Sequence, residues 1–367
     1  KGRVMFISNA IKIVGCLMML FGNHPLIAYA VVGLGAAAYS PAKYGILTEL
    51  LPPSQLVKAN GWIEGLTITS IILGVLVGGQ LLSPGISTHL LDFDLPLLDT
   101  GVDTAAEAAI AVLVGVYALA AWFNLRIPLT DTILRPLRQD PSKSLLANTL
   151  ALLPDFWTCS QRLWGDKLGQ ISLSTTTLFW GVSGNLRYIV LAWGAAALGY
   201  GTSQASALVG VVAIGTAAGA ILASMRMRLD NATRVIPLGI TMGLLVIAMI
   251  FIHSVWVAIP FLILLGGLGG FLVVPMNALL QHRGHNLMGA GRSIAVQNFN
   301  EQACILALGA FYALSTKFGL SAFGAITVFG LVVAGIMWLI GRWHRNNLRQ
   351  HPEEVERLLA IARKDCH

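Results

Sequence analysis

The chain has 367 residues, of which 56% are hydrophobic and only 11% are charged. A soluble domain usually carries about 25% charged residues, so this composition largely excludes a cytosolic enzyme of one or two domains. The apolar residues come in runs of about 20, the length that crosses a bilayer. The formal net charge of +7 would favour nucleic acid in a soluble protein, but the basic residues lie in short loops between these runs. We interpret this charge as a signal of membrane orientation and predict no nucleic-acid partner.

The apolar runs predict an all-α polytopic membrane protein. A bilayer interior permits only helices or closed barrels, and these runs are too long and too continuously apolar for barrel strands. In chain order, the ten predicted spans cover residues 4–22, 25–47, 60–82, 105–125, 171–195, 204–224, 235–253, 256–280, 290–314 and 319–341.

The remaining segments complete the predicted organisation. The proline-containing segment 126–170 separates four spans from six, and we expect amphipathic surface helices at 144–153 and 155–168. A further short amphipathic helix is expected near 352–364 in the polar tail. The predicted parts are an N-terminal half, a cytoplasmic linker, a C-terminal six-helix half and a cytoplasmic tail, covering residues 1–125, 126–170, 171–341 and 342–367.

The loops separate by charge. If both termini are cytoplasmic, 21 of the 24 Lys and Arg residues fall on the cytoplasmic side, and the opposite side holds only Lys317. The largest loop on that opposite side, residues 83–104, carries four aspartates and no Lys or Arg. This is a strong positive-inside signal, and it predicts both termini of the complete protein in the cytoplasm.

An internal repeat indicates duplication. Residues 33–47 resemble 267–281, and residues 58–64 resemble 289–295, at offsets of 234 and 231. If the second half begins near residue 171, the first half begins about 62 residues before Lys1, which leaves room for two more spans. We therefore expect twelve spans in two parallel six-helix halves, the architecture of major facilitator transporters, with the first two helices absent from this chain.

Polar residues inside spans are costly in a bilayer and are the first candidates for function. We predict that six of them line a substrate pathway, although an inter-helix ion pair that only fixes packing is the alternative. They are Lys12, Glu64, Arg187, Gln297, Asn298 and Glu301. Gln297 and Asn298 precede Glu301 by four and three residues, which places all three on one helix face.

Other residues are candidates for gating, bending or close packing of helices that move during transport. Lys43 and Glu49 are candidates for a gate at the cytoplasmic mouth, with interfacial snorkelling as the alternative. Pro41 and Pro275 would kink their spans at matching places in the two halves. Three glycine pairs four residues apart would let helices approach closely: Gly74 and Gly78, Gly215 and Gly219, and Gly266 and Gly270.

Motifs for metal, cofactor or enzyme chemistry are absent from the sequence. Four cysteines form no CxxC pair and are interpreted as inert thiols, and His282 and His285 have no carboxylate or cysteine close in sequence. There is no P-loop, no Gly-x-Ser-x-Gly elbow and no His-Glu-x-x-His. We expect no metal, no cofactor and no enzyme activity.

Five segments resemble the bacterial lysophospholipid transporters of the major facilitator superfamily. They are "GLGAAAYSPAKYGILTEL" at 33–50, "LVKANGWIE" at 56–64, "LFWGVSGNLRYIVLAW" at 178–193, "GGFLVVPMNALLQHRGH" at 269–285 and "GAGRSIAVQNFNE" at 289–301. The resemblance runs from Lys1 to about Arg345. It implies a multi-pass protein of the bacterial inner membrane that moves lysophosphatidylethanolamine and lysophosphatidylglycerol from the outer to the inner leaflet. It also implies functional coupling to a cytoplasmic acyltransferase/acyl-ACP synthetase that reacylates them, and we expect a monomer.

The substrate suggests roles for the predicted residues. Arg187 is the candidate phosphate contact, because a guanidinium binds phosphate well. Glu64, Gln297, Asn298 and Glu301 would hold the ammonium or glycerol of the head group or take part in gating. Two alternatives stay open. One is a proton-coupled exporter of drugs or amphiphiles, with Glu64 or Glu301 as the proton carrier, and the other is a membrane scaffold without transport.

Overall fold

The computed structural model describes residues 1–81, 104–128 and 145–364. Within these ranges the chain is helical apart from short turns, and it contains no strand. The acidic loop predicted at 83–104 lies outside the described residues except for Thr104, and so does Cys366. Thr104 caps the helix that follows, because its side chain accepts from the Glu107 N–H while the Glu107 carboxylate accepts from the Thr104 N–H.

Each of the ten predicted spans lies on a long helical segment. These are α1 (Gly2–Leu20), α2 (Pro25–Leu50), α3 (Pro53–Leu81), α5 (Ala105–Asn124), α8 (Gly169–Leu198), α9 (Thr202–Arg226), α10 (Ile236–Ala248), α11 (Val255–Met288), α12 (Ala290–Lys317) and α13 (Ala322–Gln350). Two 3-10 segments, η1 (Leu229–Val235) and η2 (Met249–Phe251), extend α10 at its two ends. The predicted all-helical fold class is thereby confirmed.

Seven of these helical segments, in the part of the chain that the structure describes, are long and apolar enough to cross a membrane. The other three, α3, α8 and α12, have 29, 30 and 28 residues and are therefore also long enough. They carry more polar residues, and two of them contribute buried polar side chains to the site described below. The least apolar helices are thus among those that hold the polar interior.

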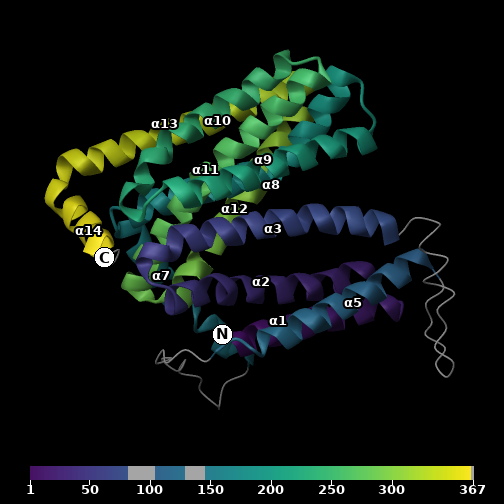
Figure 1. Ribbon diagram of the computed structural model, residues 1–367, viewed down its shortest axis with the longest axis horizontal. Helices are drawn as coiled ribbons and strands as arrows, with labels where there is room; N and C mark the ends of the chain where they lie inside the picture. The colour runs from purple at the N-terminus through teal and green to yellow at the C-terminus, as the bar shows by residue number, and fades with distance from the viewer. Residues whose placement is uncertain (82–103, 129–144, 365–367) are drawn as a thin grey trace. The chain divides into compact units, whose positions relative to one another are not determined.

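The helices form two compact units. Unit 1 comprises Lys1–Leu50 and Ser70–Arg135, and unit 2 comprises Leu51–Thr69 and Pro136–His367. Helix α3 contributes to both, since its residues up to Thr69 pack in unit 2 and its later residues in unit 1. Within unit 1, α1 packs against both α2 and α5 (Figure 1).

Unit 2 contains the close glycine contact that the sequence predicts. Gly215 and Gly219 of α9 face α11, and Gly266 and Gly270 of α11 face α9, so that a methyl group added at any of the four would meet backbone atoms of the other helix. Small residues at this spacing let two backbones touch. An added methyl group at the third predicted pair, Gly74 and Gly78, would meet nothing within 4 Å.

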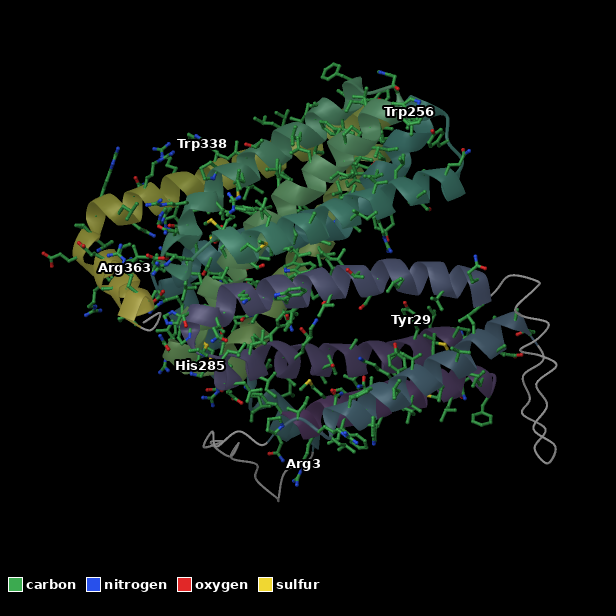
Figure 2. The ribbon with its side chains drawn as sticks, viewed as in Figure 1. Arg3, Tyr29, Trp256, His285, Trp338 and Arg363 are labelled. Atoms are coloured by element: carbon green, nitrogen blue, oxygen red, sulfur yellow. The ribbon has the colours of Figure 1, made fainter. Side chains whose placement is uncertain are left out.

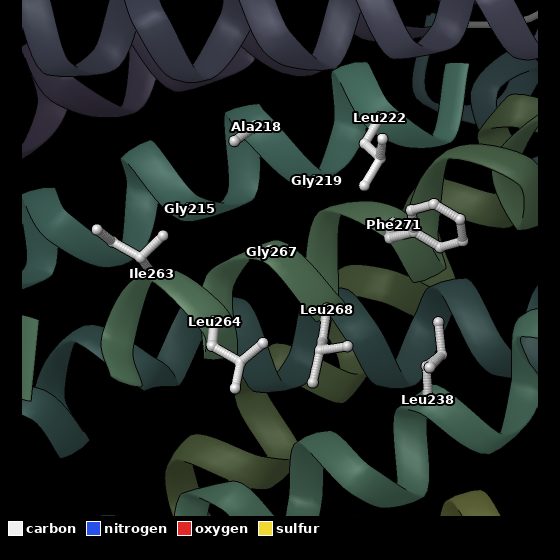
Figure 3. Close-up of a pocket in the computed structure, with 10 residues that line it drawn as sticks. All are labelled: Gly215, Ala218, Gly219, Leu222, Leu238, Ile263, Leu264, Gly267, Leu268 and Phe271. Carbon is white, nitrogen blue, oxygen red and sulfur yellow. The ribbon is translucent and has the colours of Figure 1, made fainter. Parts of the chain in front are cut away.

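An apolar pocket of about 450 Å³ lies beside the glycine contact (Figure 3). Residues of α9, α10 and α11 line it, namely Gly215, Ala218, Gly219, Leu222, Leu238, Ile263, Leu264, Gly267, Leu268 and Phe271. Its larger lining side chains, such as Leu222, Leu264 and Phe271, are all apolar. It offers no charged group to a polar ligand.

Shorter helices complete unit 2. Helices α6 (Leu145–Leu150) and α7 (Leu153–Gly165) occupy the segment where surface helices were expected, and α14 (Pro352–Lys364) occupies the predicted tail helix. One face of α14 is buried against η1 and α13 through Val355, Leu358 and Ala362. The tail helix is therefore docked on the unit rather than fully solvated (Figure 1).

Candidate functional site

Six buried polar side chains lie on three helices of unit 2. Each helix contributes two residues four positions apart, which places both on one face. They are Asn60 and Glu64 on α3, Asn277 and Gln281 on α11, and Gln297 and Glu301 on α12. None of the six is more than 7% exposed, so any charge among them is held away from water.

Hydrogen bonds join five of these residues into one chain. Asn60 and Gln281 exchange two bonds, since each amide nitrogen donates to the other amide oxygen at 2.9 Å. The Asn277 amide donates to Asn60 Oδ1 over a longer 3.5 Å. Gln297 Nε2 donates both to Asn277 Oδ1 and to Glu301 Oε1, each at 2.7 Å. The chain thus runs from α3 through α11 to a carboxyl group on α12.

Two carboxyl groups belong to this polar interior. Glu64 and Glu301 are both buried, and each lies four residues from an amide of the hydrogen-bonded chain, Glu64 from Asn60 and Glu301 from Gln297. Burying carboxylates inside a span is expensive and marks ion, proton or substrate pathways. This pair, next to amide donors and acceptors, can accept hydrogen bonds from an ammonium or a hydroxyl group, or bind a proton.

The structure brings only some of the predicted pathway residues together. Glu64, Gln297 and Glu301 share the buried interior, and Asn298 is half-buried on α12 beside them in sequence. Arg187 is exposed on α8, where its Nη2 donates to the Tyr188 hydroxyl at 2.8 Å and its guanidinium carbon lies 4.8 Å from the Tyr188 ring centre. Its described contacts are therefore separate from the amide chain.

The remaining predicted residues lie in unit 1, except Pro275 in the interior of α11. Pro41 is in the interior of α2, and on the same helix the Lys43 ammonium lies 4.9 Å from the Tyr44 ring centre. Glu49 forms an ion pair with Lys1. The gate role of Lys43 and Glu49 stays a prediction.

Sequence reasoning missed Asn60, Asn277 and Gln281. A usable signal was present, because Asn60 precedes Glu64 by four residues and Asn277 precedes Gln281 by four. Either pair places two polar groups on one face of a span. Their mutual contact was not visible, since 221 residues separate Asn60 from Gln281.

A second buried polar contact fixes one end of unit 2. Asp166, between α7 and α8, accepts from the Gly169 N–H at 2.7 Å. The Arg283 guanidinium of α11 binds the same carboxylate through Nε at 3.1 Å and Nη2 at 2.6 Å. Both side chains are at most 7% exposed. This two-pronged ion pair ties the α7–α8 connection to α11.

In the described ranges, no group of three or more His, Cys, Asp or Glu is placed to hold a metal ion. Cys159 on α7 packs into an apolar cluster with Leu163 and Leu173. Burial, and to a smaller extent the Asp155 carboxylate, raise the pKa of the Cys159 thiol, which stays protonated at neutral pH. Such a thiol is unreactive.

The amide chain should contribute measurably to stability. We expect Gln281→Leu to lower the free energy of unfolding by about 1–2 kcal/mol, because it leaves Asn60 buried with fewer partners. The double variant Asn60→Leu/Gln281→Leu should recover part of this loss, since both partners are then gone. Thermal unfolding in detergent measures each variant. Asn300→Leu is the control, because among the described residues Asn300 donates only to Val296 O, on its own helix. A double variant that is no more stable than Gln281→Leu would contradict the pairing.

Ten long helical segments with a polar interior, in the part of the chain that the structure describes, are typical of a polytopic membrane transporter. A family model described as the Major Facilitator Superfamily matches residues 1–305, and the chain belongs to this superfamily. The fold agrees with solved transporters. Against FucP in the outward conformation the TM-score is 0.63, at 12% identity, covering 94% of this chain and 83% of that one. Against the human organic anion transporter MFSD10 (TETRAN) the TM-score is 0.67, at 14% identity, covering 94% and 76%.

Sequence relatives indicate to which branch of this superfamily the chain is similar. The chain is 39% identical over 320 residues to proteins named Lysophospholipid transporter LplT from Yersinia pestis (strain Pestoides F) and Yersinia pseudotuberculosis serotype O:3 (strain YPIII). In both comparisons the match covers 87% of this chain and 72% of the relative. The family resemblance predicted from the sequence is thereby confirmed.

Proposed function

We propose that this protein transports lysophospholipids, such as lysophosphatidylethanolamine and lysophosphatidylglycerol. The observation that carries the proposal is the 39% identity over 87% of the chain to proteins named for lysophospholipid transport. The polar interior of unit 2, with its amides and carboxyl groups, suits the polar head group of a lysophospholipid better than it suits an apolar solute.

The residues of unit 2 offer each chemical group of that substrate a partner. The exposed Arg187 guanidinium can bind the phosphate through two parallel hydrogen bonds. Glu64, Gln297 and Glu301 can accept from an ammonium or from glycerol hydroxyls, with Asn298 beside them. The apolar helix surfaces are suited to the acyl chain.

Direction and location form part of the same proposal. The basic loops support cytoplasmic termini for the complete protein. The similarity to proteins named for lysophospholipid transport supports a location in the bacterial inner membrane. Transport then runs from the outer to the inner leaflet, where a cytoplasmic acyltransferase/acyl-ACP synthetase reacylates the product. The working unit is a monomer, with Lys43 and Glu49 at its cytoplasmic gate and kinks at Pro41 and Pro275.

Leaflet-resolved uptake of labelled lysophosphatidylethanolamine into proteoliposomes tests the proposal. We expect uptake by the wild type and a loss of tenfold or more in Arg187→Ala, since a hydrogen bond to a charged group contributes about 1.5–3 kcal/mol. Arg187→Lys should keep part of the rate. Arg226→Ala, at another exposed arginine, is the control. Normal uptake by well-inserted Arg187→Ala would remove Arg187 from the mechanism, and no uptake by the wild type would overturn the function.

The buried Glu64 and Glu301 favour one alternative, a proton-coupled exporter of amphiphiles. Glu301→Gln keeps an oxygen that can accept from Gln297 but removes the titrating group. If the protein is an exporter of this kind, a pH gradient should drive efflux of dyes or drugs, and Glu301→Gln should abolish it. A lysophospholipid transporter should instead show lipid movement and no drug efflux in the same vesicles.

A further inference from the structure

Unit 1 contains a lysine inside a membrane span. Lys12 lies in the middle of α1 and is half-buried. Its stem packs against α2 at Gly35, where an added Cβ would lie 2.8 Å from Lys12 Cγ. The absent side chain at Gly35 therefore makes room for the lysine, and the lysine belongs to the packing of α1 on α2.

Three neutral groups surround the Lys12 ammonium. It donates to Asn9 Oδ1 at 3.2 Å on its own helix. It lies 4.4 Å from the ring centre of Tyr39 on α2 and 5.3 Å from that of Tyr117 on α5. All three helices of this part of unit 1 thus converge on one cation. Aromatic faces attract a cation, but they do not neutralise its charge.

The charge of this cluster stays uncompensated in the part of unit 1 that the structure describes. No ion pair joins Lys12 to a carboxylate there, and its described contacts are Asn9 Oδ1 and the two tyrosine rings. Among the same residues, neither the Tyr39 nor the Tyr117 hydroxyl makes a hydrogen bond, and both rings are half-buried. A cation and two phenol donors are therefore available to one ligand.

We propose that Lys12, Tyr39 and Tyr117 form a subsite of unit 1 that binds the phosphodiester of a lysophospholipid head group. The ammonium pairs with one phosphate oxygen, and the phenol hydroxyls donate to others. A lysine inside a span is costly, and an anionic ligand offsets that cost. This subsite rests on the proposed function and adds to it a second cationic contact, in a unit that does not contain Arg187.

Binding of two lipids to the purified full chain in detergent tests the subsite. Lysophosphatidylglycerol carries the phosphodiester, and a monoacylglycerol with the same acyl chain lacks it. We expect Lys12→Gln to weaken lysophosphatidylglycerol binding tenfold or more and to leave monoacylglycerol binding unchanged. Lys12→Arg should stay within a few fold of the wild type. Lys317→Gln is the matched control, because Lys317 is exposed at the end of α12.

A second variant tests the subsite if Lys12→Gln does not fold. Tyr39→Phe/Tyr117→Phe keeps both rings over the lysine and removes only the hydroxyl donors, so we expect a several-fold loss confined to lysophosphatidylglycerol. The subsite is overturned if either variant binds lysophosphatidylglycerol like the wild type, or if it loses both lipids equally, as a structural lysine would. A wild type that binds and transports no lysophospholipid would instead refute the proposed function itself.

Discussion

Asp166→Asn is expected to lower the free energy of unfolding by about 3–5 kcal/mol, because it leaves the Arg283 guanidinium buried without a counter-charge. Both partners are nearly inaccessible to water, and the carboxylate makes two bonds to Arg283 and a third to the Gly169 N–H. An asparagine can accept only part of this set. The loss should appear as a lower midpoint in thermal or denaturant unfolding in detergent.

An exposed ion pair in the same part of the chain provides the control. Asp155 on α7 pairs with Arg292 on α12 at 3.1 Å, but these side chains are 48% and 43% exposed. Exposed pairs contribute about 0–1 kcal/mol, so Asp155→Asn should be close to wild type. The double variant Asp166→Leu/Arg283→Met should be more stable than Asp166→Asn, because no buried charge remains unpaired. Equal losses at Asp155 and Asp166 would contradict the role assigned to burial.

The helices were predictable from the sequence because the bilayer imposes a simple rule. Runs of about 20 apolar residues must be helical, and every predicted span lies on a helix with ends shifted by a few residues. The shifts are largest where helices continue into polar sequence. Helix α11 runs on to Met288 and α13 to Gln350, beyond predicted ends at 280 and 341. Hydropathy marks where a bilayer ends, and it does not mark where backbone hydrogen bonding ends.

The candidate site was predictable only one helix at a time. The spacing of Gln297 and Glu301 predicted their shared face, and the structure joins them at 2.7 Å. The partners of this face come from other helices, and nothing in the local sequence specifies that Gln297 meets Asn277. The Asp166–Arg283 pair is similarly hidden, because 117 residues separate its members. Long-range contacts depend on how the helices pack, which a single sequence does not display.

Gly219→Ala is expected to lower the free energy of unfolding by about 3 kcal/mol, at the upper end of the usual cost of overpacking. The added methyl group would meet the backbone of Gly267, so α9 and α11 must separate or shift. The neighbour is backbone rather than a flexible side chain, and no rotamer change can relieve the clash. Gly270→Ala, on the opposite helix, should cost a similar amount because its methyl group would meet Thr216 O.

Gly210→Ala separates the clash from any general effect of losing a glycine in α9. An added Cβ at Gly210 meets nothing within 4 Å, and alanine is the better helix former by about 1 kcal/mol. This variant should therefore be neutral or slightly more stable in the same unfolding measurement. Because α11 also carries Asn277 and Gln281, a shift of α11 in Gly219→Ala should disturb the amide chain and lower lysophospholipid uptake along with stability. If Gly219→Ala and Gly210→Ala behave alike, the two helices do not depend on this glycine contact.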